Sequence, residues 1–247
     1  QVIFGNLPER VALACPMPVL MARKYRGLSR LWLQRLWNGL YGVLPKLSRR
    51  QQAEVYRTLR RGARPDVDFF VMMALAAIIA TFGLLQSSAA VIIGAMLVAP
   101  LFTPIISLSM AIVRSDARLL ALAAESAIKG IILATGIGTV LAFLSPLLTL
   151  TSEISSRTRP NLLDLAVALA SGAAGAYALA RKDVAASLPG VGIAAALVPP
   201  LCTVGIGLAM GEAGVASGAV LLFFTNLVAI TLAGAVALLL LGFRPVR

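Results

Sequence analysis

After residue 68 the chain is dominated by hydrophobic residues, which fall into six long runs separated by short polar segments. The runs cover residues 69–86, 88–113, 119–148, 162–180, 188–210 and 213–243. A helix of about 20 residues crosses the hydrocarbon core of a bilayer, and these runs have that length. The pattern therefore predicts an all-α membrane domain of six transmembrane helices over residues 69–247.

The segment before these runs, residues 25–68, carries apolar and basic side chains at the spacing of two helices. Ser48 and Gln51 form a plausible capping box at the start of the second helix. Gly62 and Pro65 end that helix. Because arginine-rich amphipathic helices lie in the membrane interface, we expect a basic helical linker on the cytoplasmic membrane surface.

Two of the predicted spans match one another at an offset of 100 residues. Residues 91–110 read VIIGAMLVAPLFTPIISLSM, and residues 191–210 read VGIAAALVPPLCTVGIGLAM. Eleven of the 20 positions are identical, among them a Pro, a Thr and a Met. The copies are three spans apart, an odd number, so the two halves cross the membrane in opposite directions. We predict an inverted repeat, with repeat 1 over about residues 69–148 and repeat 2 over about residues 162–243.

Prolines interrupt both copies of the repeat part-way along the span, and a threonine stands beside each interruption. The residues concerned are Pro100, Thr103, Pro104, Pro199, Pro200 and Thr203. Proline removes a backbone donor and breaks a helix, so the freed carbonyl groups need partners. Paired broken helices are typical of transporter binding sites, which makes these residues candidates for a substrate or ion pathway. The alternative is that the prolines only bend the helices.

Four further polar residues lie inside the predicted spans. Thr225 and Asn226 lie near the middle of the sixth span, where a buried amide needs hydrogen-bond partners. They either line the pathway or hold helices together. Glu125 and Lys129 are four residues apart and can form a charged pair on one face of the third span. Ionisable groups in a membrane are functional candidates, but we favour a position for this pair at the cytoplasmic interface.

Positive charges concentrate on one side of the predicted membrane domain. Residues 1–68 hold 13 Lys and Arg against 4 Asp and Glu, and the second and fourth loops and the C-terminal tail are also basic. The third loop is the exception, with Arg157 and Arg159 against Glu153 and Asp164. The positive-inside rule therefore predicts that both termini are cytoplasmic.

Composition narrows the classes of function. Hydrophobic residues make up 59% of the chain and charged residues 13%, which is typical of membrane proteins. The chain has no His and only two cysteines, Cys15 and Cys202, so we expect no metal site and no cofactor within it. No catalytic motif is recognisable, so we expect no enzyme. Because the basic segment precedes a hydrophobic domain, we expect it to contact the lipid bilayer rather than nucleic acid.

Small residues are closely spaced in two GxxxG patterns, Gly207 with Gly211 and Gly214 with Gly218. Such patterns favour tight helix packing, either inside one chain or between subunits. Together with the small size of the bundle, they predict a homo-oligomer, which could also belong to a larger membrane complex.

The start of the chain carries a recognisable pair of segments. Residues 4–11 read FGNLPERV and residues 15–23 read CPMPVLMAR. Residues 1–24 thereby resemble the C-terminal end of a universal stress protein domain, and an ordinary linker is the alternative. The resemblance implies a cytoplasmic domain whose remainder would lie upstream. Most of that family's phosphate-binding motif is not among these residues, so nucleotide binding is not assigned to this chain.

A second resemblance covers residues 62–245. It rests on segments RPDVDFF at 64–70, IIGAMLVAPL at 92–101, SGAAGAYA at 171–178, LVPPL at 197–201 and FTNLVAI at 224–230. These segments resemble domain of unknown function 389, a family of multi-pass membrane proteins of bacteria and archaea. The resemblance implies the cytoplasmic (inner) membrane and no known substrate. The family often has Asn-Ser-Pro or Asp-Ser-Pro where this chain has Gln86-Ser87-Ser88, so a role for that amide or acid is not carried over.

The leading hypothesis is a transporter or channel for a small ion or solute, regulated by a cytoplasmic stress-type domain. The spans place no charged residue clearly at the membrane midplane, which argues against a proton pump. The alternative is a non-transporting membrane anchor or a scaffold subunit of a larger complex.

Overall fold

The computed structural model describes residues 47–145, 149–181, 184 and 197–245. Contacts divide the chain into Gln1–Val43 and Leu44–Arg247, and every described residue belongs to the second unit. The predictions for the stress-protein remnant, the first linker helix and Cys15 therefore lie outside the described residues. So does the start of the fifth predicted span, residues 188–196.

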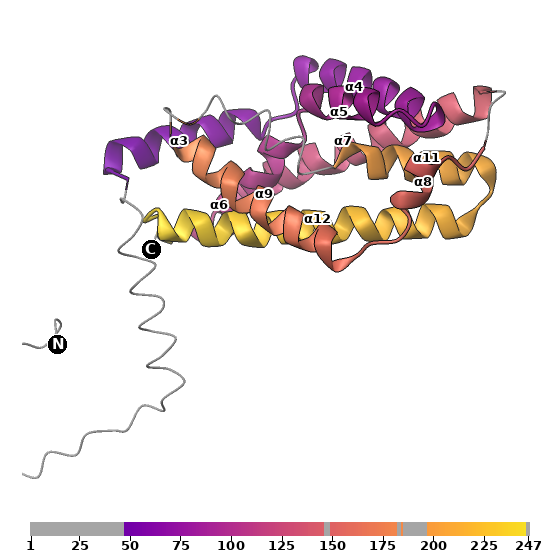
Figure 1. The fold of residues 1–247 in the computed structure, drawn as a ribbon. Helices are drawn as coiled ribbons and strands as arrows, with labels where there is room; N and C mark the ends of the chain where they lie inside the picture. The colour runs from indigo at the N-terminus through magenta and orange to yellow at the C-terminus, as the bar shows by residue number, and fades with distance from the viewer. Residues whose placement is uncertain (1–46, 146–148, 182–183, 185–196, 246–247) are drawn as a thin grey trace, which may run out of the picture. The chain divides into compact units, whose positions relative to one another are not determined.

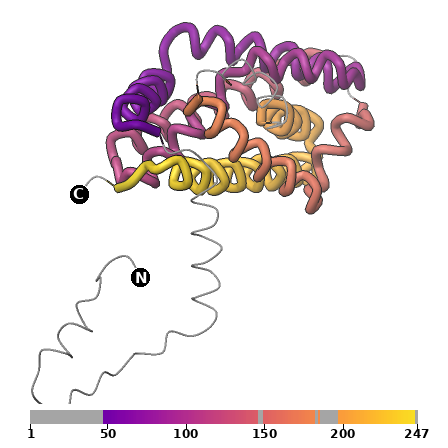
Figure 2. Tube along the Cα trace, turned by 60° about the vertical axis from the view of Figure 1, so that its left-hand side comes forward, coloured from indigo at the N-terminus to yellow at the C-terminus, as the bar shows by residue number. Residues whose placement is uncertain are grey.

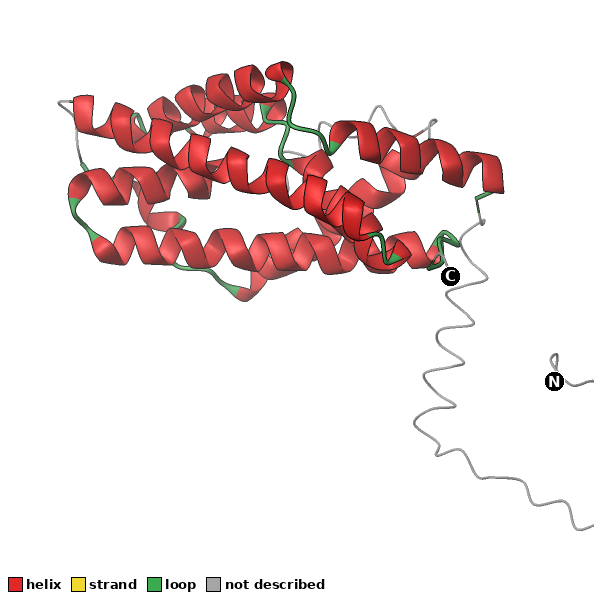
Figure 3. Cartoon of the chain, turned by 180° about the vertical axis from the view of Figure 1, so that it is seen from behind, coloured by secondary structure: helices red, strands yellow, loops and turns green. Residues whose placement is uncertain are grey.

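The described part of the chain contains helices and no strand, as Figure 3 shows, which confirms the predicted all-α class over these residues. The helices are α3 (Arg49–Gly62), α4 (Val67–Leu85), α5 (Ala89–Val98), α6 (Phe102–Arg114), α7 (Ala117–Leu144), α8 (Ser152–Ser156), α9 (Leu162–Ala180), α11 (Val198–Met210) and α12 (Ala213–Leu240).

Four of these helices, α4, α7, α9 and α12, are long and apolar enough to cross a membrane. Helices α5 and α6 form a fifth candidate span that is bent by 54° at the segment between them. Helix α11 is apolar but has only 13 residues. The structure thus supports a membrane protein with four to five spans within the described residues, and the sixth span stays a prediction.

Polar side chains cap the helices near the positions that the hydrophobic pattern indicates. The capping box at α3 is present, with the Ser48 N–H donating to Gln51 Oε1 at 2.9 Å. The Asp66 carboxylate accepts from the first turn of α4, and the Asp116 carboxylate accepts from the first turn of α7. These caps satisfy backbone donors that a helix start leaves free, so α3, α4 and α7 begin where a short polar segment ends, whereas α5, α6, α11 and α12 begin without a side-chain cap.

Glycines set the closest approaches between the helices. Helix α9 packs along α12, as Figures 1 and 2 both show, and α7 packs against α11. A Cβ atom on Gly172 of α9 would lie 2.5 Å from the Ile230 carbonyl oxygen of α12. Of the GxxxG residues, Gly207 and Gly218 face backbone atoms of this same chain. The GxxxG patterns therefore serve packing within the chain at these two positions.

Helix lengths recur along the chain. Helices α6 and α11 each have 13 residues, and α7 and α12 each have 28. Helices α11 and α12 begin 96 residues after α6 and α7. Both short helices end at a left-handed residue, Ser115 with φ 54° and Gly211 with φ 71°. The packing recurs too, because α7 contacts α11 and α6 contacts α12. The spacing of 96 residues between helix starts differs from the sequence offset of 100 residues by about one helical turn. Aligning the two halves at either spacing therefore places matched residues on the same face of the helix.

Helix α3 packs along α6 rather than standing apart from the bundle (Figure 1). The Ser107 hydroxyl of α6 donates to the Leu59 carbonyl at 3.0 Å, and Gly62 lies beside Thr103 at the start of α6. Tyr56 lies near the opposite end of α6, where it bonds to the turn before α7. Helix α3 therefore runs antiparallel to α6 and ends beside the bend between α5 and α6.

Candidate functional site

The break predicted in the second span is present, and its local cause is visible in the backbone. Ala99 ends α5 in an extended conformation with ψ 123°, as expected for a residue that precedes a proline. Pro104 is the third residue of α6, where a backbone N–H would have no partner inside the helix. Pro100 therefore separates two helices, and Pro104 is accommodated in the first turn of the second helix.

The second copy of the break begins a helix in the same way. Pro199 and Pro200 are the second and third residues of α11. The Thr203 hydroxyl donates to the Pro199 carbonyl at 2.9 Å. The Ser107 hydroxyl shares its single proton between the Leu59 carbonyl and the Thr103 carbonyl, and its 2.8 Å contact with Thr103 corresponds to the Thr203 bond at the 96-residue spacing. The two helix starts thus share a proline in the first turn and a hydroxyl bonded one turn back.

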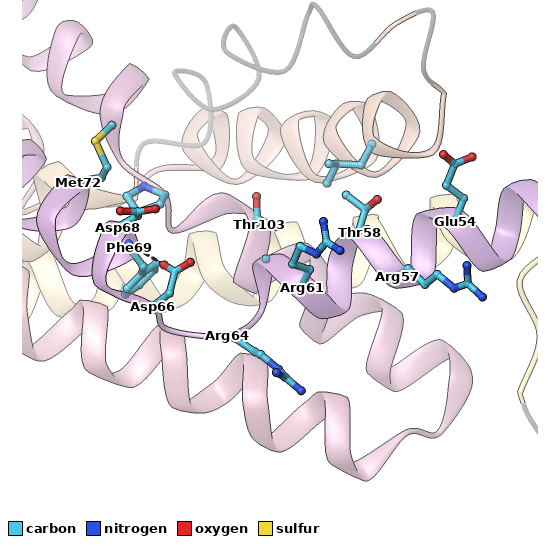
Figure 4. Close-up of a pocket in the computed structure, with 13 residues that line it drawn as sticks. Glu54, Arg57, Thr58, Arg61, Arg64, Asp66, Asp68, Phe69, Met72 and Thr103 are labelled. Atoms are coloured by element: carbon cyan, nitrogen blue, oxygen red, sulfur yellow. Dashed lines mark hydrogen bonds between the residues drawn. The ribbon is translucent and has the colours of Figure 1, made fainter.

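A cavity of about 560 Å³ opens beside the first break. Its lining comes from α3, the segment after it, the start of α4, the break and α9, and Figure 4 shows these side chains: Glu54, Arg57, Thr58, Arg61, Gly62, Arg64, Asp66, Asp68, Phe69, Met72, Pro100, Thr103 and Leu179. Two predicted site residues, Pro100 and Thr103, therefore share a cavity with six charged residues. Charges are costly to desolvate, so we expect a cavity lined in this way to be hydrated.

The arginines and the aspartates occupy different parts of this cavity, and Glu54 lies on α3 with the arginines. Arg57, Arg61 and Arg64 lie on α3 and just after it, and Asp66 and Asp68 lie at the start of α4 (Figure 4). The Asp66 carboxylate is engaged as the cap of α4, where it accepts a backbone N–H at 2.9 Å. The arrangement can bind a polar or charged solute beside the broken helix.

A polar contact holds α3 against the end of α6. The Tyr56 hydroxyl donates a hydrogen bond to the Asp116 carboxylate, and the Arg114 guanidinium lies 4.7 Å from the centre of the Tyr56 ring. The hydrogen bond to Asp116, together with burial, raises the pKa of Tyr56 above its ordinary value. The same bond, together with the backbone N–H of Leu119, lowers the pKa of Asp116. Near neutral pH Tyr56 is therefore protonated and Asp116 ionised, which are the states in which this hydrogen bond forms.

The other predicted site residues do not line this cavity. Pro104, Pro199, Pro200 and Thr203 are buried. Thr225 is half-buried. Asn226 is buried, and its carbonyl oxygen has no hydrogen-bond partner in the structure. Glu125 and Lys129 form an ion pair on α7 with about half of each side chain exposed.

The sequence pattern did not indicate that charged residues lie beside the break. These residues are Arg57, Arg61, Arg64, Asp66 and Asp68. The helical spacing of the arginines was visible in the sequence, but no pattern indicated that α3 packs on α6. Across the described ranges, no three acidic or cysteine side chains lie close enough together to hold a metal ion.

A family profile described as domain of unknown function (DUF389) matches residues 96–232, more than half of the chain. The chain belongs to the DUF389 family. The match includes both breaks and Asn226 and is narrower than the resemblance over residues 62–245. Helices α3 and α4, which supply most of the cavity lining, lie outside the DUF389 match.

A similar curated protein also has no assigned function. An uncharacterised protein from Methanocaldococcus jannaschii is 28% identical over 194 residues, which cover 78% of this chain. The alignment spans 60% of that relative's length, so the relative is the longer protein. No solved structure matches the chain. Membership of DUF389 and the apolar helices together establish a membrane protein of a family whose function is unknown.

Proposed function

We propose that this DUF389 protein is a transporter or channel for a small ion or solute in the cytoplasmic membrane of a bacterium or archaeon. One observation carries the proposal: Pro100 and Thr103, at the break in a membrane span, line the same cavity as the charged residues that precede the first span. Broken helices beside a hydrated cavity are how many secondary transporters build their binding sites. The proposal requires no chemical step and no bound cofactor.

An inverted repeat of two three-span halves accounts for the recurrence of helix boundaries. A pseudo-two-fold fold repeats helix lengths and contacts, as α6 and α7 do with α11 and α12, and the left-handed C-cap of α6 recurs in α11. Helices α4 and α9, both of 19 residues, would be the first spans of the two halves. The equivalent hydroxyl bonds of Ser107 and Thr203 support the same pairing.

The two breaks differ in exposure, which supports a state that is open to one side. Thr103 lines the cavity, whereas its counterpart at the 96-residue spacing, Pro199, and its counterpart in the sequence repeat, Thr203, are both buried. Alternating access opens one side of such a repeat while the other side is closed. We infer that the open side faces the cytoplasm, because the arginine-rich helix α3 lies there under the positive-inside rule.

Both termini are cytoplasmic in this proposal. The third loop was the exception to the charge pattern, since it holds arginines on the outer side. Arg157 in that loop pairs with Glu153 at 2.7 Å, so this pair is formally neutral. The remaining loops follow the positive-inside rule as the sequence arranges them.

Helix α3 would transmit regulation from a stress-type domain upstream. It follows the segment that resembles the end of such a domain, and it ends beside Thr103. A change in the position of α3 would therefore alter the cavity wall directly. We also propose a homo-oligomer, although Gly207 and Gly218 are already used in packing within the chain.

Cysteine labelling tests the pathway. In a chain with Cys15→Ser and Cys202→Ala, single cysteines replace Thr103 or the matched residue Thr203, and an impermeant maleimide is applied to the cytoplasmic side. We expect T103C to react because it lines the cavity, and T203C to be protected because it is buried. N226C serves as a second buried position. Protection of T103C, while an exposed control R118C reacts, would contradict the pathway and favour the anchor or scaffold function.

Flux measurements in proteoliposomes test transport itself. A Thr103→Trp substitution would fill the cavity beside the break, whereas Ile132→Trp on the exposed face of α7 would leave it open. We expect T103W to reduce the flux of any transported ion or solute at least about tenfold relative to I132W. Equal flux through both variants would show that the cavity is not the pathway.

A further inference from the structure

Four arginines on one face of helix α3 and of the residues just after it form no ion pair within the described ranges. Arg57, Arg60, Arg61 and Arg64 follow the i, i+3, i+4, i+7 spacing and line a common cavity of about 280 Å³. All four side chains are exposed. The ion pairs in the described residues are Glu125 with Lys129 and Glu153 with Arg157, and neither includes these arginines.

This concentration of like charge destabilises the helix unless an anion relieves it. Arginines three and four residues apart are neighbours on a helix surface and repel one another. Arg60 and Arg61 lie in the last turn of α3, where the helix dipole favours cations. Arg57 lies one turn earlier and Arg64 follows the helix, so the dipole does not account for the whole set.

Two of the nearby carboxylates hold helix starts, and one of them, Asp116, also has a coulombic interaction with Arg60. Asp66 caps α4 by accepting the Phe69 N–H at 2.9 Å. Asp116 accepts the Tyr56 hydroxyl and two backbone N–H groups at the start of α7. Glu54 and Asp68 line the larger cavity with three of these arginines, but the four arginines outnumber them, so an external anion can bind to the arginine face.

We propose that Arg57, Arg60, Arg61 and Arg64 form a binding site for a phosphate group. The guanidinium fork matches two phosphate oxygens, and several arginines together favour phosphate over monovalent anions. Arg57, Arg61 and Arg64 also line the larger cavity, so the bound phosphate would lie at its mouth. The group can belong to an anionic lipid headgroup of the cytoplasmic leaflet or to a free phosphate from the cytoplasm. The site does not depend on transport activity.

Thermal unfolding of the full chain in detergent tests this site. The probes are phosphatidylglycerol against phosphatidylcholine of the same chain length, and inorganic phosphate against chloride at equal ionic strength. The double variant R57Q/R61Q removes two charges from the arginine face. The matched variant R49Q/R50Q removes two charges from the same helix outside both cavities. Variant R57K/R61K keeps the charge and removes the fork.

We expect the effective probe to raise the Tm of the wild type and of R49Q/R50Q by about 5 °C at saturation. We expect R57Q/R61Q to bind it at least about tenfold more weakly, with R57K/R61K intermediate. A response to phosphatidylglycerol alone identifies lipid, a response to inorganic phosphate alone identifies the free anion, and both responses show that either form binds.

The proposal is wrong if neither probe stabilises the wild type, or if R49Q/R50Q and R57Q/R61Q lose the response equally. Tm values without ligand check that the variants are folded. If R57Q/R61Q does not fold, R57K/R61K decides alone, and an unchanged response in that variant overturns the phosphate site.

Discussion

At the scale of single residues, glycines in this bundle differ in how closely a neighbouring helix approaches their α-carbon. A Cβ on Gly172 would meet the Ile230 backbone of α12, with its Cα at 2.7 Å, whereas a Cβ on Gly136 of α7 would meet nothing within 4 Å. Backbone atoms cannot move aside as a flexible side chain can. The same substitution should therefore have opposite consequences at the two positions.

We predict that Gly172→Ala lowers the free energy of unfolding by about 2 kcal/mol, because α9 and α12 must separate. Gly136→Ala should be neutral or slightly stabilising, since alanine is the better helix former. Thermal unfolding in detergent measures both variants. A loss of stability in G136A as large as that in G172A would contradict the assigned helix contact.

The Tyr56 hydroxyl is a second feature at the scale of single residues, because its hydrogen bond to Asp116 connects α3 to the start of α7. We predict that Tyr56→Phe costs about 1 kcal/mol, the worth of one hydrogen bond to a partly exposed carboxylate. Hydrogen exchange of the α3 amides should increase, while exchange in α9, which the bond does not touch, should not. Unchanged exchange in α3 would show that the bond does not hold the helix.

The same bond predicts a pH dependence. The pKa of Asp116 is lowered from 3.8, so its contribution is present above pH 3.8 and is lost as pH falls through the lowered value. The pKa of Tyr56 is raised from 10.0, so its contribution is present below pH 10.0 and is lost as pH rises through the raised value. The Tm difference between wild type and Y56F should therefore be constant between these limits and shrink beyond both. A difference that changes near pH 7 would point to another group.

At the scale of elements, the prolines of the two breaks occupy helix starts. Pro104 and Pro200 are each the third residue of their helix, where the missing N–H has no partner to lose. The extended conformation of Ala99 and the segment after it therefore maintain the break in the second span. Pro104 and Pro200 themselves should be replaceable.

We predict that Pro104→Ala and Pro200→Ala change the free energy of unfolding by less than about 1 kcal/mol. Gly136→Pro, inside α7 at an open position, should cost about 3 kcal/mol because it breaks a helix interior. Thermal unfolding compares the three variants. A cost for P104A close to that for G136P would mean that the proline itself maintains the bend.

The elements that sequence could predict are those that depend on local patterns. The bounds of α9 agree with the hydrophobic run, and the capping box at Ser48 was recognisable because capping is a short-range interaction. The position of α3 on α6 was not, because it depends on contacts such as that of Ser107 with Leu59, 48 residues apart. The arginine and aspartate lining of the cavity follows from that packing, so sequence alone found only Pro100 and Thr103 of the site.

At the scale of the whole molecule, the proposed topology places the first and third loops together on the outer side of the membrane. The structure brings them into contact, since the hydroxyls of Ser87 and Ser152 lie 2.8 Å apart. This contact joins two loops that are 65 residues apart in the chain. It offers a test of fold and orientation together.

We predict that the pair S87C/S152C, in a chain without its own cysteines, forms a disulfide in intact cells. The outer side of the cytoplasmic membrane supports disulfide formation and the cytoplasm does not. Mobility shift on a non-reducing gel measures the bond. Formation only after cell lysis would reverse the orientation, and no bond even with added oxidant would contradict the contact between the loops.

Helices α7 and α12, each of 28 residues, are about 42 Å long, whereas the hydrocarbon core is about 30 Å thick. This is a hydrophobic mismatch, and the two helices meet it differently. Helix α7 carries Arg118, Glu125 and Lys129 in its first half, so that end can leave the lipid. Helix α12 has no charged residue along its whole length.

One side of the apolar end of α12 is instead covered by protein. Leu238 and Leu241 are fully buried in one core cluster with Leu47, whose N–H donates to the Leu241 carbonyl at 3.2 Å just before α3 begins. The chain thus covers this part of α12 with its own apolar side chains where the helix extends beyond the hydrocarbon core. Undocking of α3 would then expose an apolar overhang, and the docked state would be favoured in thin membranes and relaxed in thick ones. Bilayer thickness would then influence whether α3 is docked.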